Sequence, residues 1–307
     1  MGGNLTIEEL EKRANDIRID IIKMLEAAGS GHSAGPLGLT DIFTALYFHI
    51  LKHDPKNPDW EERDVLVLSN GHCVPVRYAT MAHAGYFPKE ELMTLRKFGS
   101  RLQGHPERLR LPGMETTSGP LGSGLSQATG MALALKMDPV RGKNSANSAD
   151  SKTNRASNGM DKSKRQVYVV MSDGELDEGN SWEAAMLAAK YNPGNLIAVV
   201  DRNNIQIDGP TEVVMPLEGL RAKWEAFGWF VLEINGNDIE AIIGAVEMAK
   251  AVTEKPVVII AHTIPGKGVD FMEYDFHWHG KAPNHEEAKK ALHELRTLGG
   301  KIKSEHE

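Results

Sequence analysis

The stretch of sequence that decides the fold is VYVVMSDGELDEGNSWEAAMLAAKYNPGNLIAVVDRNNI, residues 167–205. It opens with an apolar, β-branched run at 167–171 and closes with a second such run at 196–200. Residues 182–191, between them, have the composition of a helix. Two strands joined through a helix are parallel neighbours connected by a right-handed crossover. The stretch therefore predicts one strand–helix–strand unit of a parallel sheet.

The same alternation continues on both sides of this unit. Further strand-like runs lie at 65–68, 230–234 and 257–261. Thr6 and Glu9 form a capping box ahead of a first amphipathic helix, and Pro88 is placed to open another. The remaining expected helices are 39–51, 217–227 and 239–252. We expect an α/β fold, a mostly parallel sheet with helices on both faces, in a single domain spanning residues 1–307.

One segment, at about 138–164, departs from this pattern. It is rich in Ser, Asn, Lys and Asp and offers almost nothing to bury. Such a composition predicts a low-complexity surface insertion. The insertion is interpreted either as functionless or as a contact for a partner protein.

The composition excludes several classes of function. A net charge of −7 over 307 residues gives no electrostatic reason to bind nucleic acid or an anionic membrane. The only cysteine, Cys73, cannot pair within the chain, which fits a reducing compartment. The sequence contains neither a signal-peptide pattern nor an apolar run long enough to span a membrane. We expect a soluble cytoplasmic protein.

Polar clusters follow the two strands of the deciding stretch. Asp173 comes directly after the first strand, and Asn203 and Ile205 come directly after the second. Because the carboxyl ends of parallel strands meet at one edge of a sheet, these residues should lie close together. A carboxylate, an amide oxygen and the backbone carbonyl of Ile205 are hard ligands suited to Mg²⁺ or Ca²⁺. The alternative is that Asp-Gly forms an ordinary turn and the asparagine pair a loop cap.

These clusters resemble the thiamine diphosphate fingerprint, which begins Gly-Asp-Gly and ends in an asparagine pair. Ser172 replaces the first glycine, which fits if that position has a negative φ. Other ordered motifs, from about residue 17 to 279, narrow the resemblance to the transketolase family. They are Ser30-Gly31-His32, Gly35-Pro36-Leu37-Gly38, Leu68-Ser69-Asn70-Gly71-His72, Gly104-His105-Pro106-Glu107, Thr116-Thr117-Ser118-Gly119-Pro120-Leu121-Gly122, Gly174-Glu175-Leu176-Asp177-Glu178-Gly179 and His277-Trp278-His279-Gly280.

The resemblance implies roles for four histidines. His32 and His105 would hold hydroxyls of the donor sugar, His72 would contact the cofactor phosphates, and His279 would lie between the phosphate and the reacting carbon. Imidazoles also suit a site where protons move near neutral pH. Each histidine alone is equally compatible with a surface or hydrogen-bonded core position.

The resemblance implies further cofactor contacts. Gly119 would contact the aminopyrimidine ring through its backbone and Leu121 would pack against it, although their loop is also compatible with an ordinary helix-entry turn. The helix after this loop should offer unpaired backbone amides. Gly174 and Asn203 would lie against the diphosphate. Glu178, with Glu183, would lie near the subunit contact, although acidic residues here also suit the helix dipole.

The activating glutamate of such enzymes lies in a second, pyrimidine-binding domain that this sequence lacks. The chain therefore resembles the diphosphate-binding subunit of a split transketolase, which pairs with a pyrimidine-binding subunit, in an α₂β₂ assembly. It is expected to transfer a two-carbon ketol unit from a ketose to an aldose, both as sugar phosphates, with thiamine diphosphate and Mg²⁺. Alternatives are a 2-oxoacid dehydrogenase α chain, a deoxyxylulose-phosphate-synthase-like protein, and a non-catalytic cofactor-binding subunit.

Overall fold

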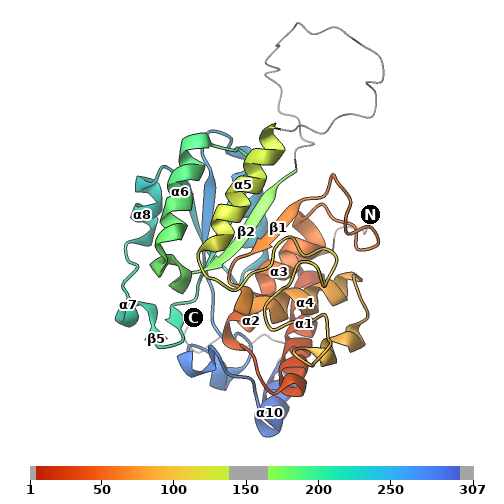
Figure 1. Cartoon of the computed structure of the whole chain (residues 1–307). Helices are drawn as coiled ribbons and strands as arrows, with labels where there is room; N and C mark the ends of the chain where they lie inside the picture. The colour runs from red at the N-terminus through yellow and green to blue at the C-terminus, as the bar shows by residue number, and fades with distance from the viewer. Residues whose placement is uncertain (1–4, 138–164, 298–307) are drawn as a thin grey trace, which may run out of the picture.

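A parallel β-sheet organises the chain. The computed structural model describes residues 5–137 and 165–297, so the predicted insertion at 138–164 lies outside the described residues (Figure 1). Neighbouring strands of the main sheet all run parallel, in the order β1-β2-β3-β7-β6. These strands are β1 (Val65–Leu68), β2 (Val167–Ser172), β3 (Leu196–Arg202), β6 (Phe230–Asn235) and β7 (Val257–His262). The predicted parallel strands are thereby confirmed.

Helices surround the sheet, and short turns connect the elements. The α-helices are α1 (Ile7–Ala28), α2 (Ala34–Gly38), α3 (Thr40–Ala45), α4 (Val74–Ala84), α5 (Ser123–Met137), α6 (Gly179–Tyr191), α7 (Thr211–Val214), α8 (Leu220–Ala226), α9 (Ile239–Ala251) and α10 (His285–Thr297). The shorter elements are η1 (Leu46–Ile50), η2 (Gly71–Cys73), η3 (Lys89–Thr94), η4 (Gly174–Asp177), η5 (Asp270–Met272), η6 (Phe276–Trp278), β4 (Ile205–Gln206) and β5 (Gly209–Pro210).

The sheet is buried on both faces. Helices α5, α6 and α8 pack on one face, and α1, α3, α4 and α9 lie on the other (Figure 1). Successive strand residues alternate between the two layers, so Val167 and Val169 join the first apolar cluster whereas Tyr168 and Val170 join the second. Because both faces are covered, the strands consist of continuous apolar runs rather than alternating ones.

Local signals set the limits of α1 as the sequence predicts. The hydroxyl of Thr6 accepts the amide of Glu9 at 3.2 Å, and the Glu9 carboxylate accepts the amide of Thr6 at 2.8 Å. The helix ends at Gly29, whose φ of 65° is left-handed. The predicted capping box is confirmed. Among the described residues, no helix is both long and apolar enough to cross a membrane.

Three predicted helices differ in the structure. The segment 39–51 is not one α-helix, because α3 widens into the π-helical turn η1, where the amide of Leu51 reaches the carbonyl of Leu46. Pro88 is extended and precedes a 3₁₀ segment rather than an α-helix. The helix predicted at 217–227 begins at Leu220, because the amide of Leu217 bonds to the Glu212 carboxylate at 3.1 Å instead of entering a helix.

Candidate functional site

The two polar clusters meet at the carboxyl edge of the sheet, as predicted. Ser172 pairs with Asp201 at the ends of β2 and β3. The amide of Asn204 donates to Oδ2 of Asp173 at 2.7 Å, and the amide of Asp173 donates to the carbonyl of Asp201 at 3.1 Å. Asn204 has a φ of 64°, a left-handed conformation that asparagine tolerates. Parallel pairing thus brings both clusters into one site.

Buried negative charge accumulates at this edge. Asp173, Glu175 and Asp201 are each 0% exposed. Desolvation raises the pKa of Asp173 to about 6 and those of Glu175 and Asp201 to about 7. Arg202 is the described cation that pairs with Asp173, at 3.2 Å. Three buried carboxyl groups beside one guanidinium make an environment that favours a further cation.

The oxygen atoms available for a metal are hard donors. Asn203 donates from Nδ2 to Asp201 at 2.8 Å, which orients its amide, and its Oδ1 accepts the amide of Ile205 at 3.0 Å. Within residues 5–137 and 165–297, no three His, Cys, Asp or Glu side chains converge on a metal position. The predicted ligand set contains only one carboxylate, that of Asp173, together with an amide and a carbonyl oxygen. These donors and the surplus negative charge fit a divalent cation bound beside an anionic cofactor.

The four predicted histidines converge, although their loops are far apart in the sequence. The ring of His32 lies 4.9 Å from that of His72, 5.6 Å from that of His279 and 6.4 Å from that of His105, between centroids. The rings of His72 and His279 are 5.0 Å apart. The loop after α1, the end of β1, the segment containing His105 and the end of η6 therefore contribute to one cluster.

Burial keeps these imidazoles neutral near pH 7. Desolvation is the main cause for all four, lowering the pKa of His32 to about 4 and that of His72 well below its usual value. The pKa values of His105 and His279 are lowered as well. A neutral imidazole can both donate and accept a hydrogen bond, so the cluster suits hydroxyl groups and proton movement.

Arg96 belongs to the site although the sequence motifs do not indicate it. Its positive charge contributes to the lowered pKa values of His32 and His105. A Cβ at Gly104 would lie 2.8 Å from its Nε, so the glycine beside His105 makes room for the guanidinium. Arg96 also has a φ of 59°, an uncommon conformation that often occurs at functional sites.

The loop 119–122 lies against the histidine cluster. A Cβ at Gly119 would be 3.9 Å from Cδ2 of His105, and Leu121 is half-buried. The amides of Gly122 and Gly124, at the start of α5, are however bonded to Glu175 and Ser69. The expectation of unpaired amides is wrong at these two positions, because long-range side chains occupy them.

The remaining predicted positions lie around this loop. Gly174 is half-buried, and its amide donates to Asp173 at 2.8 Å. Glu178 is exposed at the start of α6, close to Gly122, where a Cβ would be 2.8 Å from its own Cβ. Glu183 is exposed on the same helix. These acidic residues are therefore open to a neighbouring molecule.

Several buried polar atoms near the loop have no partner among the described residues. Asn70 is 0% exposed, and neither its Oδ1 nor its Nδ2 is hydrogen-bonded. The hydroxyls of Thr116 and Ser118 and Nδ1 of His32 are also without partners. Since buried polar groups are normally satisfied, their grouping here fits a site that a polar ligand completes.

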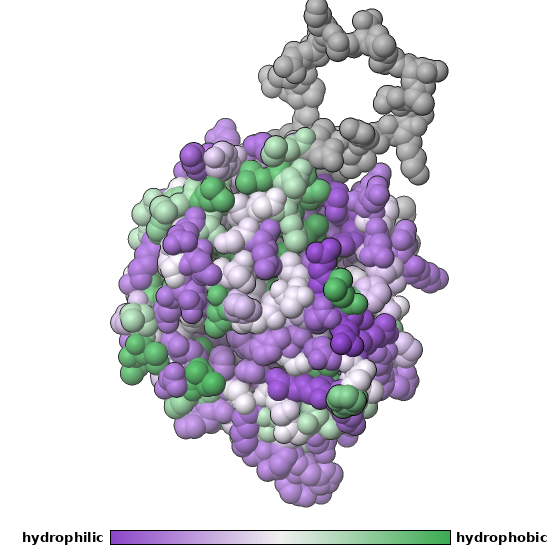
Figure 2. All heavy atoms as spheres, viewed as in Figure 1, coloured by the Kyte–Doolittle hydropathy of each residue, from purple (hydrophilic) through white to green (hydrophobic). Residues whose placement is uncertain are grey.

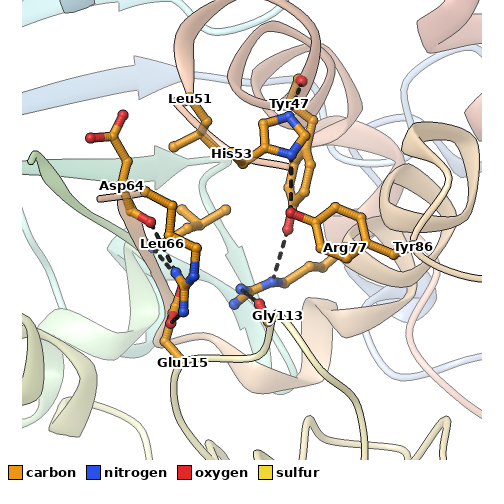
Figure 3. Close-up of a pocket in the computed structure, with 10 residues that line it drawn as sticks. Tyr47, Leu51, His53, Asp64, Leu66, Arg77, Tyr86, Gly113 and Glu115 are labelled. Atoms are coloured by element: carbon orange, nitrogen blue, oxygen red, sulfur yellow. Dashed lines mark hydrogen bonds and ion pairs between the residues drawn. The ribbon is translucent and has the colours of Figure 1, made fainter. Parts of the chain in front are cut away.

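A separate cavity of about 20 Å³ lies at the opposite edge of the sheet, around the start of β1 (Figure 3). Arg77 crosses it, donating to the Tyr47 hydroxyl at 3.3 Å and to the carbonyl of Gly113 at 3.0 Å. His53 contacts the Tyr86 hydroxyl at 3.0 Å. This space is sufficient for about one water molecule. None of the four clustered histidines lines it, so it is distinct from the candidate site.

Known proteins resemble this chain over almost its whole length. The family profile described as "Transketolase, thiamine diphosphate binding domain" matches residues 10–299. One of the two subunits of the apulose-4-phosphate transketolase of Phocaeicola vulgatus is 39% identical over 302 residues, covering 98% of this chain and 99% of that protein. The 6-deoxy-6-sulfo-D-fructose transketolase subunit SqwG of a Clostridium species is 41% identical, covering 95% of this chain and 98% of its own.

Longer proteins match over part of their length. The chloroplastic transketolase of Zea mays is 39% identical, over 92% of this chain but 40% of that protein. The crystal structure of transketolase from Campylobacter jejuni superposes with a TM-score of 0.82 at 37% identity. It covers 95% of this chain and 43% of that one. The α/β fold predicted from the sequence is confirmed by this similarity.

Proposed function

Since the chain belongs to the transketolase family, we propose that it forms the diphosphate, metal and donor-sugar side of a ketol-transfer site. The observation that carries this proposal is the convergence of buried Asp173 and the neutral histidine cluster at one sheet edge. The family match favours this function over a 2-oxoacid dehydrogenase α chain or a deoxyxylulose-phosphate-synthase-like protein. The chain is thus a transferase subunit.

The metal would be Mg²⁺, held by Asp173, Asn203 and the carbonyl of Ile205. The hard oxygen donors and the surplus negative charge support this proposal. Arg202 orients the carboxylate of Asp173 from the protein side. Ca²⁺ uses the same donor type, and titration with each ion separates the two.

When bound, thiamine diphosphate supplies the electron sink for cleaving a carbon–carbon bond of the ketose. His72, Gly174 and Asn203 would contact its phosphates, and Gly119 and Leu121 its aminopyrimidine ring. His32, His105 and His279 would hold sugar hydroxyls and move protons, which their lowered pKa values support by keeping them neutral. Preorganised donors of this kind stabilise charge developing on oxygen.

The substrates would be a ketose phosphate donor and an aldose phosphate acceptor, pentose phosphates among them. The names of two relatives support an anionic sugar, because one carries a phosphate and the other a sulfo group. Ketol transfer measured over a panel of phosphorylated and unphosphorylated ketoses tests this proposal. Equal rates with both kinds of donor would contradict it.

The partner would be a pyrimidine-binding transketolase subunit in an α₂β₂ assembly. Two relatives that match this chain nearly end to end are named as subunits, which supports a separate partner chain. Apolar side chains also lie exposed on α6 and around α7 (Figure 2), among them Met186, Leu187 and Val213. Co-purification and mass measurement of the complex test the stoichiometry. We also propose a cytoplasmic location, supported by the single cysteine, Cys73.

A further inference from the structure

Glu175 is a buried carboxylate that neither the metal ligands nor the histidine cluster accounts for. It lies in η4, and its side chain accepts three hydrogen bonds. The donors are the hydroxyl of Ser69, the amide of Gly122 at 2.6 Å and the amide of Ser172 at 3.2 Å. One carboxylate therefore joins the ends of β1 and β2 to the loop that precedes α5.

Ser69 extends this connection by one residue. While its hydroxyl donates to Glu175, the same oxygen accepts the amide of Gly124 at 3.0 Å. Two amides at the start of α5, those of Gly122 and Gly124, are thus bonded to residues fixed by the sheet. Bonds to an ionised acceptor are about twice as strong as neutral ones.

Close packing limits where the loop can lie. Gly122 has a φ of 81°, and a Cβ there would lie 1.8 Å from Oδ1 of Asn180. A Cβ at Gly71 would be 2.5 Å from Oγ of Ser118 and 3.2 Å from the amide of Gly119. These contacts are steric and block approach from two sides. The directional bonds that attach the loop to the sheet edge come from Glu175 and Ser69.

We propose that Glu175 is a positioning residue that fixes the 119–122 loop at the height needed to receive the aminopyrimidine ring of thiamine diphosphate. Glu175 acts through Gly122 and Ser69 and does not itself touch the cofactor. Removing its carboxylate leaves the buried Gly122 amide without an acceptor, which costs about 1–3 kcal/mol. The loop relieves this cost by moving, and Gly119 and Leu121 move with it. This inference rests on the proposed function.

Asp64 provides a matched control at the other end of the sheet. It is 8% exposed, and its carboxylate accepts the amides of Lys52 at 2.9 Å and Gln166 at 2.8 Å. It therefore resembles Glu175 in burial and in bonding backbone amides. Because it lies at the amino edge of β1, its loss should lower stability without affecting the loop 119–122.

The test compares Glu175→Ala, Glu175→Gln and Asp64→Asn in the full chain assembled with its partner. Hydrogen exchange of a peptide spanning 118–125 and calorimetric titration with thiamine diphosphate and Mg²⁺ are the two readouts. For Glu175→Ala we expect exchange and Kd each to rise at least about tenfold, and Glu175→Gln to restore most of both, since it keeps an acceptor oxygen. Asp64→Asn should lower Tm and leave Kd within about twofold of wild type.

Unchanged exchange in Glu175→Ala, or a Kd that follows Tm equally in Glu175→Ala and Asp64→Asn, would overturn the inference. If Glu175→Ala does not fold, Ser69→Ala takes its place. It frees the Gly124 amide but keeps the Gly122 bond, so smaller changes in the same direction are expected and their absence counts against the proposal. Failure of the wild-type assembly to bind thiamine diphosphate sinks the proposed function, whereas the exchange result still decides whether Glu175 holds the loop.

Discussion

Oδ2 of Asp173 accepts a hydrogen bond from the backbone amide of Asn204 at 2.7 Å, across 31 positions of sequence. This bond joins the two polar clusters that follow β2 and β3. It also fixes the orientation of the carboxylate, because Oδ1 accepts the amide of Gly174 at 2.8 Å. The direction of the chain after each strand, rather than long side chains, thus assembles the candidate metal site.

Replacing Asp173 should abolish metal-dependent cofactor binding and leave the fold intact. Burial already raises the pKa of Asp173 to about 6, so the neutral Asp173→Asn side chain is well tolerated. We expect the Kd for thiamine diphosphate with Mg²⁺ to rise about 100-fold, which is about 2.7 kcal/mol. Calorimetry measures the affinity and thermal unfolding the fold. Glu212→Gln, which changes the exposed partner of Arg202, is the control, and wild-type affinity in Asp173→Asn would refute the assignment.

Loss of His105 should affect chemistry more than cofactor binding. Its ring lies 6.4 Å from that of His32 at the more exposed side of the cluster. We expect His105→Ala to lower kcat by about 10²-fold, the usual effect of losing one preorganised donor, with a small change in cofactor affinity. Steady-state kinetics of the assembled enzyme measure this, and unchanged kcat removes His105 from the site.

The neutral state of His32 predicts a pH dependence of stability. The unfolded chain binds a proton on this residue near pH 6.5, whereas the folded chain binds it only near pH 4, because burial lowers the pKa. Between these values the unfolded state holds more protons, so wild type should lose stability as the pH falls. The limit is about 1.4 kcal/mol per pH unit, reduced by the partial exposure of the ring.

Urea unfolding of wild type and His32→Gln at pH 7, 6 and 5 checks this dependence. The stability difference between them should shift against wild type as the pH falls, while contributions from buried carboxyl groups cancel in the comparison. Curves that stay parallel over this range would show that His32 titrates normally in the folded chain.

Much of this fold could be predicted because local patterns carry it. Apolar runs such as those of β2 and β3 reflect burial on both faces, and the cluster after each strand follows from parallel geometry. Helix α10 was missed although a local signal exists, since its buried residues Ala288, Ala291 and Leu295 are spaced three and four apart. Spacing of this kind indicates an amphipathic helix.

The site was harder to predict where its contacts are remote. Glu175 meets Gly122 across 53 positions, and no local pattern records that bond. Arg96 lies outside every quoted motif, and the glycine that makes room for it, Gly104, was interpreted only as part of the His105 motif. Four histidines beside small residues were informative because several such motifs occurred together. Single buried charges carry no comparable signal in the sequence.

The chain alone should not catalyse ketol transfer. It presents the buried metal carboxylate Asp173 and the histidine cluster, while the activating glutamate of such enzymes is expected on the partner protein. We expect turnover only after the partner is added to the chain saturated with thiamine diphosphate and Mg²⁺. Turnover by the chain alone, with mass spectrometry showing no co-purified protein, would contradict the two-subunit proposal.

A surface variant can locate the face that binds this partner. Met186 on α6 and Met248 on α9 are each 54% exposed, but their helices cover opposite faces of the sheet. Leu187 and Tyr191 extend the apolar surface around Met186, and Figure 2 shows apolar side chains gathered over this part of the molecule. If the partner docks there, Met186→Glu places a charge within a buried apolar contact. Met248→Glu introduces the same charge on the other face.

We therefore expect Met186→Glu to weaken assembly with the pyrimidine-binding partner by at least about tenfold and Met248→Glu to leave it within about twofold, because only the first charge would be desolvated. Analytical ultracentrifugation or surface plasmon resonance measures the affinity, and thermal unfolding confirms that both variants remain folded. Equal weakening by both substitutions would point to a general effect of added negative charge on this acidic chain. Weakening by Met248→Glu alone would place the partner on the α9 face, and the interface proposed on α6 would then be wrong.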